Sequence, residues 1–123
     1  MILADTSIWI DHLRRPNPKL HILLDFGQIL MHPFVLGELA LGSFSNRERL
    51  LKQLYQLPQA IMISNKEVIL FITKHKLFGT GIDYIDAHLL VAARHTIGAQ
   101  LWTRDKRLFA ASTRVGVASD MTS

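Results

Sequence analysis

Residues 2–7 read ILADTS, an apolar run that ends on an acid followed by two hydroxyl residues. The run Ile2–Ala4 has the length and composition of a short buried strand. Asp5, Thr6 and Ser7 are residue types that begin helices, so a helix is predicted directly behind the strand. A second interpretation places Asp5 in a functional site, because open parallel α/β sheets bind ligands at the carboxyl ends of their strands. The rest of the chain has to decide between the two.

The alternation of strand and helix continues along the chain. Short apolar runs of strand length occur at Ile2–Ala4, Ile29–His32, Ala60–Ser64, Gln100–Thr103 and Val115–Ala118. Segments with helical spacing lie between these runs, and a last short helix follows Asp105. Strands that alternate with helices favour a parallel sheet covered on both faces. The prediction is therefore a three-layer α/β/α sandwich, with residues 1–123 in a single domain.

The composition excludes several classes of protein. Hydrophobic residues make up 49% of the chain, so a disordered protein is not expected. The absence of cysteine excludes disulfides, cysteine-ligated zinc and thiol catalysis, and it suits a reducing cytoplasm. Asp5 and Asp11 interrupt what would otherwise be a signal peptide, and no apolar run approaches the roughly 20 residues of a membrane helix. A cytoplasmic protein without a membrane partner is expected.

The formal net charge is +4, from 14 basic and 10 acidic residues. This modest excess suits a polyanionic partner such as nucleic acid, although many basic proteins without such a partner have a similar balance. Charge alone therefore does not identify the partner.

Four acids stand at positions that a parallel sheet would bring together. Asp5 and Asp105 each follow a predicted strand. Glu38 lies on the helix behind the second strand, and Asp86 lies in the first turn of the most apolar helix. The carboxyl ends of parallel strands share one edge with the helix N-termini that follow them, so all four acids are expected there. Clustered carboxylates repel one another, and a hard divalent cation such as Mg²⁺ or Mn²⁺ would neutralise them.

Each acid also has a purely structural interpretation. Asp105 could cap its helix, and Asp86 could complete a capping box with Asp83. Glu38 is harder to explain in this way, because a carboxylate is rarely buried unless it is paired. Asp5 has the strongest functional case, since a helix cap does not need an acid as well as two hydroxyl residues.

Four motifs carry a family resemblance: ADTS at 4–7, GEL at 37–39, DAHLLVAA at 86–93 and WTRDKRL at 102–108. In this order they resemble the PIN-domain ribonucleases, and most of all the VapC-type toxins of bacterial toxin–antitoxin pairs. The resemblance spans nearly the whole chain. It implies a mostly parallel five-stranded sheet of order 3-2-1-4-5, a homodimer and a cognate antitoxin. It also implies a Mg²⁺- or Mn²⁺-dependent endoribonuclease that hydrolyses RNA phosphodiester bonds and inhibits translation or growth.

The resemblance assigns roles to the four acids. Asp5 and Asp86 would hold a metal ion that activates water and polarises the phosphate. Glu38 would hold or deprotonate that water, and Asp105 would bind a second metal or orient waters. The implied catalytic set is Asp5, Glu38, Asp86 and Asp105, with Asp5, Asp86 and Asp105 as metal ligands. Such a mechanism needs no histidine, so the six histidines are expected to be structural or exposed. The role of His88, within one turn of Asp86, stays open.

The resemblance also singles out residues beside the acids. Thr6 and Ser7 match hydroxyl positions next to the first acid, and Thr103 matches the one before the last. Lys106 and Arg107 stand where some relatives carry a further acid, which puts a tightly held second metal in doubt. The basic pair could bind RNA phosphates, or it could be a solvated helix start.

Three other functions are compatible with a chain of this architecture. A receiver domain needs an aspartate at the end of its third strand, where this chain has residues 63–65, Ile-Ser-Asn. A haloacid-dehalogenase-type phosphatase needs a second aspartate two residues after the first, where this chain has Ser7. The strongest competitor is a non-catalytic PIN-like domain that only binds RNA or a protein. Such domains typically lose acids from the cluster, so the presence of all four favours an enzyme.

Overall fold

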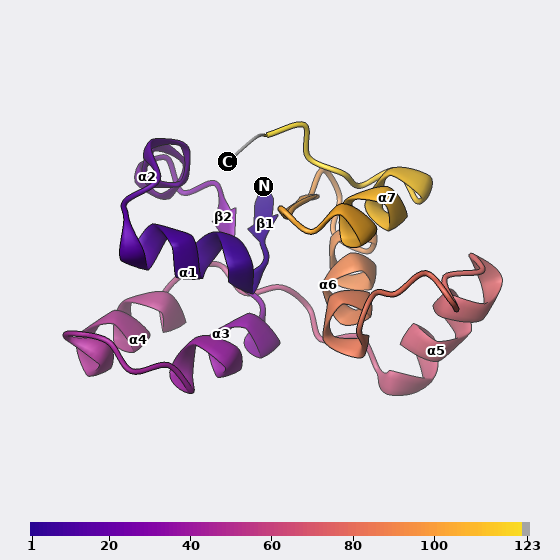
Figure 1. Cartoon of the computed structure of the whole chain (residues 1–123), viewed down its shortest axis with the longest axis horizontal. Coiled ribbons are helices and arrows are strands. Elements are labelled where there is room, and N and C mark those ends of the chain that lie inside the picture. The colour runs from indigo at the N-terminus through magenta and orange to yellow at the C-terminus, as the bar shows by residue number, and fades with distance from the viewer. Residues whose placement is uncertain (122–123) are drawn as a thin grey trace.

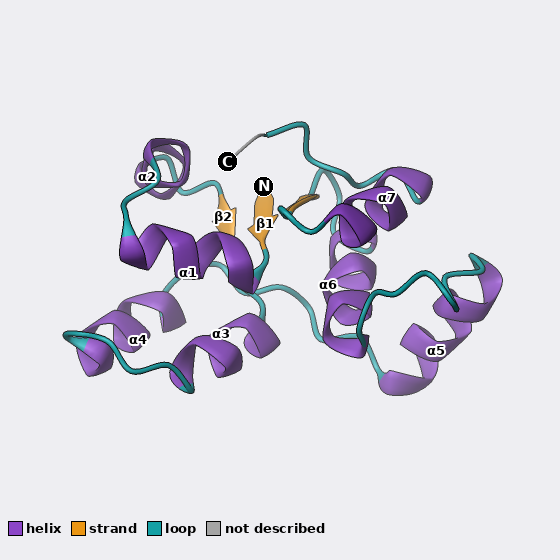
Figure 2. Ribbon diagram, viewed as in Figure 1, coloured by secondary structure: helices purple, strands orange, loops and turns teal. Residues whose placement is uncertain are grey.

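A short parallel sheet lies at the centre of the computed structural model, which describes residues 1–121 (Figures 1 and 2). The strands are β1 (Ile2–Ala4), β2 (Ile29–Leu30) and β3 (Gln100–Trp102), in the order β2-β1-β3. Leu3 of β1 pairs with Leu30 on one side and with Leu101 on the other. The predicted parallel α/β fold is confirmed.

The outer two of the five predicted strands contribute only isolated bridges. Met31 pairs with Gln59 beyond β2, and Leu101 pairs with Ala118 beyond β3, both in parallel. Ile61, which lies just after the first bridge, is 62% exposed. A segment that leaves its apolar side chains in solvent gains little from extending the ladder. The described residues therefore form a sheet of three strands, and the predicted five-stranded sheet is not present in full.

Seven helices within the described residues flank the sheet. They are α1 (Thr6–Arg14), α2 (Pro18–Asp25), α3 (Pro33–Ala40), α4 (Arg47–Tyr55), α5 (Asn65–Lys74), α6 (Tyr84–Arg94) and α7 (Lys106–Arg114). Figure 2 shows α1 to α4 on one side of the view and α5 to α7 on the other. Within residues 1–121, no helix combines the length and the apolar composition that a membrane span requires.

Among the described helices, α6 has the largest number of buried residues, and it carries Asp86 in its first turn. Residues 87–93 of this helix are all buried. Val68 of α5 packs with Ala87 and Val91 in a small second core. The helix begins at its N-cap Asp83, whose side chain accepts a hydrogen bond from the backbone N–H of Asp86. Packing of α6 along its length therefore determines where Asp86 stands.

Candidate active site

Asp5 is both a helix cap and a buried acid at the end of β1. Its Oδ1 accepts hydrogen bonds from the Ile8 N–H at 3.1 Å and the Ser7 hydroxyl at 2.6 Å. Its Oδ2 accepts a hydrogen bond from the Thr103 hydroxyl, which follows β3. The residue is only 4% exposed, and these donors offset the cost of burying a carboxylate. Oδ1 of Asp5 therefore caps the helix, while Oδ2 is bound by Thr103, the residue after the neighbouring strand.

Glu38 is joined to the same edge through Thr6. The Thr6 hydroxyl donates a hydrogen bond of 2.6 Å to Glu38 Oε1. Glu38 is partly buried on α3, a helix with a predominantly apolar sequence. Because Thr6 directly follows Asp5, this bond ties the position of one acid to that of the other.

The carboxyl group of Asp86 has a strongly raised pKa. Burial is the main cause that raises its pKa to about 7, and the charge of Asp83 is the next cause. A hydrogen bond with the Asp83 backbone opposes the rise. The charges of Asp5 and Asp105 raise the pKa of Asp86 as well, which places both carboxylates within electrostatic reach of Asp86. Segments far apart in the sequence thus converge at this edge.

Asp105 caps α7, as its structural interpretation predicted. Its Oδ1 accepts hydrogen bonds from the backbone N–H groups of Arg107 at 2.8 Å and Leu108 at 3.0 Å. Its own N–H donates to the Thr103 hydroxyl at 3.0 Å. Thr103 therefore bridges two acids, since the same hydroxyl donates to Asp5. Capping does not exclude a second role, because Asp105 is exposed and its charge reaches Asp86.

The oxygen atoms at this edge are the kind of ligand that a hard divalent cation prefers, although they do not surround a single ion position. Within residues 1–121, no three His, Cys, Asp or Glu side chains form a ready ligand set for one ion. The carboxylates and hydroxyls nevertheless offer oxygen atoms only. Mg²⁺ needs just one or two protein carboxylates, because waters and substrate phosphates complete its shell. The residues present fit an ion of that kind.

His32 is a buried histidine that the sequence pattern does not single out. It is fully buried at the N-cap of α3, where its Nδ1 accepts a hydrogen bond from the Phe34 N–H at 3.0 Å. Burial, followed by the charge of His88, lowers the pKa of His32 to about 4. His88 is also buried and contacts Asn65 Oδ1 through Nε2 at 3.1 Å. The two buried rings lie 6.5 Å apart with the edge of one toward the other, which agrees with a structural role. The signal available in the sequence was a histidine directly before Pro33, the first residue of a helix.

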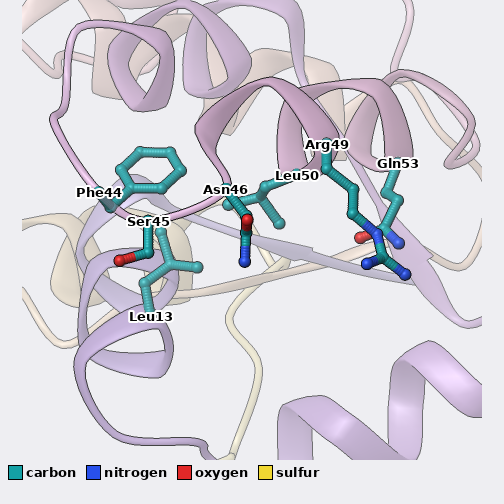
Figure 3. Close-up of a pocket in the computed structure, with 7 residues that line it drawn as sticks. All are labelled: Leu13, Phe44, Ser45, Asn46, Arg49, Leu50 and Gln53. Atoms are coloured by element: carbon teal, nitrogen blue, oxygen red, sulfur yellow. The ribbon is translucent and has the colours of Figure 1, made fainter.

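A sizeable hollow lies to one side of the acids. It has a volume of about 650 Å³, and Figure 3 shows its lining residues Leu13, Phe44, Ser45, Asn46, Arg49, Leu50 and Gln53. A smaller hollow of about 280 Å³ shares Leu13 and Phe44 with it and reaches Glu38. The hollows show where a ligand has room to bind, whereas the carboxylates are the groups that could hold a metal ion or move a proton. We therefore place the site at the acids and regard the hollows as a groove that leads to it.

Known proteins resemble the chain over nearly its whole length. A family model described as PIN domain matches residues 2–113. Ribonuclease VapC32 of Mycobacterium tuberculosis is 44% identical over 118 residues, which cover 96% of this chain and 95% of the relative. The same values hold for the protein from strain CDC 1551 / Oshkosh and from strain ATCC 25618 / H37Rv. No solved structure matches the chain.

Proposed function

Because the chain belongs to the PIN-domain family and is related to a VapC ribonuclease, we propose that it is a metal-dependent endoribonuclease that hydrolyses RNA phosphodiester bonds. The observation that carries the proposal is the convergence of Asp5 and Asp105 on Asp86, since both of their charges raise the pKa of Asp86. We further propose that the protein is the toxin of a toxin–antitoxin pair and that its RNA cleavage inhibits translation and growth.

In this proposal, Asp5, Asp86 and Asp105 hold Mg²⁺, or Mn²⁺ in its place. The bound ion supplies a Lewis acid for the phosphate and lowers the pKa of a bound water. Ser7 and Thr103 orient the two oxygens of Asp5 by donating hydrogen bonds to them. Burial disfavours the charged form of Asp86, so its carboxylate is stabilised when positive charge is placed beside it.

Glu38 acts as the general base in this proposal. Its Oε1 accepts the Thr6 hydrogen bond, which leaves Oε2 to take a proton from the attacking water. Lys106 and Arg107 lie in the first turn of α7, directly after Asp105, and both are exposed. Their positive charges bind phosphates of the RNA strand.

We propose that the antitoxin reaches the acids along the groove between α1, the loop after α3, and α4. The hollow at Glu38 is lined by Ile10, Leu39 and Phe44, which suit an apolar segment of the partner. An arginine or lysine on that segment would pair with the carboxylates, because a guanidinium can donate two hydrogen bonds to one carboxylate.

We also propose that the chain forms a homodimer. Ile22 is 54% exposed and Phe26 is 75% exposed at α2, and Tyr55 is exposed at the end of α4. Apolar side chains in solvent support an interface. Light scattering at micromolar concentration tests this proposal, and a monomer would contradict it.

We also propose that the sheet is completed to five strands in the order 3-2-1-4-5. The sheet would belong to a single domain of residues 1–123. The bridges at Gln59 and Ala118 support this order, because each lies where an outer strand would pair.

The decisive experiment is RNA cleavage by the purified protein. Cleavage is expected with Mg²⁺ or Mn²⁺ and should stop with a chelator and in the Asp5→Asn variant. Mapping the new RNA ends after brief expression would identify the bond that is cut. Cleavage that is equal in the wild type and in Asp5→Asn would show that the activity belongs to a contaminant.

The alternative is a non-catalytic PIN-like domain that binds RNA or a protein. The lack of a ready set of three metal-ligating side chains within residues 1–121 favours this alternative. Titration with Mn²⁺ separates the two functions. An enzyme should bind the ion, lose that binding in Asp86→Asn and cut RNA, whereas a binding domain should hold RNA without cutting it.

A further inference from the structure

The side chain of Arg107 lies directly against the backbone of Gly81. A Cβ atom built at Gly81 would stand 2.8 Å from Arg107 Cδ and 3.1 Å from both Nε and Nη1. Real Cβ atoms essentially never come as close as 2.8 Å to another heavy atom, so the arginine occupies space that any side chain at position 81 would need. The loop between α5 and α6, which holds Gly81, therefore contacts α7, the helix that carries Arg107.

The guanidinium of Arg107 is available to a ligand. Arg104 pairs with Asp11 of α1, and the Arg114 guanidinium donates to the carbonyl oxygen of His75 at 2.9 Å. Within residues 1–121, the Arg107 guanidinium makes neither a hydrogen bond nor an ion pair, and only its backbone N–H is bonded, to Asp105. Its side chain packs against Gly81, and the guanidinium N–H donors have no partner within residues 1–121.

Both contacts of Arg107 join it to residues that belong to, or lie close in sequence to, the acid cluster. Its backbone N–H binds Asp105, and Gly81 lies two residues before Asp83, the cap of α6. Asp83 and Asp105 are both close enough to raise the pKa of Asp86. A basic group beside these acids is suited to bind a further phosphate of an RNA strand that reaches them.

We propose that Gly81 is a positioning residue that seats the Arg107 guanidinium at the rim of the acid cluster, where it binds a backbone phosphate next to the scissile bond. This inference rests on the proposed ribonuclease function. It adds a determinant of RNA binding in the α5–α6 loop. Arginine suits the task, because its planar fork binds phosphate oxygens through two hydrogen bonds.

The test compares two glycines of one loop. Gly81 and Gly79 both have a positive φ, +87° and +73°, so alanine strains the backbone at either position. A Cβ at Gly79 meets nothing within 4 Å, whereas at Gly81 it displaces Arg107. Gly79→Ala is therefore a matched control for Gly81→Ala. The flexible arginine can move aside, so both variants should fold, which circular dichroism would verify.

Binding is measured with a fluorescent single-stranded oligoribonucleotide of mixed sequence in a chelating buffer, where no cleavage occurs. Gly81→Ala and Arg107→Ala should each weaken binding by about tenfold or more, as for one lost charged hydrogen bond. Arg107→Ala should also reduce the slope of log affinity against log salt by about 0.7, the value for one phosphate on a single strand. Gly79→Ala should bind like the wild type. In cleavage assays, KM should rise in the first two variants while kcat is preserved, because a flanking phosphate is bound equally in the ground and transition states.

A double variant decides whether Gly81 acts through Arg107. Gly81→Ala should have no further effect on binding when Arg107 is already alanine. The proposal is overturned if Gly81→Ala binds RNA no more weakly than Gly79→Ala, or if it weakens binding equally in the Arg107→Ala background. A protein that binds the oligoribonucleotide in this pattern but never cuts RNA would refute the ribonuclease and leave the role of Gly81 intact.

Discussion

Thr6 donates a 2.6 Å hydrogen bond to Glu38, which links the first turn of α1 to α3. Two further hydroxyls hold Asp5 in a similar way, from Ser7 in the same turn and from Thr103 behind β3. A hydroxyl that donates to a carboxylate restricts the direction in which the free lone pairs point. These hydroxyls therefore act as orienting groups for the acids in the proposed mechanism.

Replacing Thr6 by valine tests this orienting role. Thr6→Val keeps the shape of the side chain and removes the donor to Glu38 Oε1. We expect kcat for RNA cleavage to fall by about tenfold with KM little changed, as for one lost hydrogen bond to a charged group. Thr6→Ser retains the hydroxyl and should retain most of the activity. An unchanged kcat in the valine variant would mean that Glu38 needs no orientation by Thr6.

The four acids should be needed for cleavage and largely dispensable for folding. The variants are Asp5→Asn, Glu38→Gln, Asp86→Asn and Asp105→Asn. Each should lower cleavage by about a hundredfold or more, as for loss of a catalytic acid or base. Asparagine caps helices about as well as aspartate, so Asp105→Asn should melt like the wild type. Asp5→Asn should lose about 1 kcal/mol, because an amide NH₂ cannot accept the Thr103 hydrogen bond. A clear drop in melting temperature for two or more of the other variants would favour purely structural roles.

Asp86 should make the metal-free protein less stable as the pH rises. Its folded pKa of about 7 lies above its ordinary value of 3.8, so the folded state binds its proton more tightly than the unfolded state. This contribution to stability is fully present below about pH 4 and is lost as the pH rises to about 7. Thermal unfolding with a chelator present should show this trend in the wild type and much less of it in Asp86→Asn.

Asp83→Asn keeps the helix cap and removes one neighbouring charge, so it should keep activity and lower the pKa of Asp86.

The sequence predicted the helices better than the sheet, for physical reasons. Caps such as Asp5, Asp83 and Asp105 are local signals, and each one begins a helix in the structure. Strand length at the sheet edges depends on what covers them, and Ile61 stays exposed, so an apolar run there did not become a strand. The convergence of the acids followed from topology. The resemblance singled out Thr103 as a hydroxyl beside the last acid, but its link between Asp5 and the backbone of Asp105 depends on side-chain geometry that the sequence does not give.

The buried cap His32 should make the protein sensitive to acid. Its folded pKa of about 4 lies below its ordinary value of 6.5, so the unfolded state takes up a proton first as the pH falls. The stability that depends on neutral His32 is complete above about pH 6.5 and declines toward pH 4, by at most about 3 kcal/mol. Protonation of Nδ1 would also remove the acceptor of the Phe34 N–H. Urea unfolding at pH 7 and pH 4.5 should show a smaller difference in His32→Asn than in the wild type.

An antitoxin that enters the groove at Glu38 should compete with the metal. Glu38 Oε1 is engaged by Thr6, so a basic side chain on an antitoxin in this hollow would meet Glu38 Oε2. The purified complex should therefore be inactive, and reversing the charge of the antitoxin's basic residues should weaken both binding and inhibition. Saturating Mg²⁺ should relieve inhibition in part, because the cation and the basic side chain of the antitoxin compete for the same carboxylate oxygens. Measuring RNA cleavage across a matrix of antitoxin and Mg²⁺ concentrations tests this. Inhibition that ignores both Mg²⁺ and the basic residues would rule out direct competition, and steric blocking of the RNA path would then be the better account.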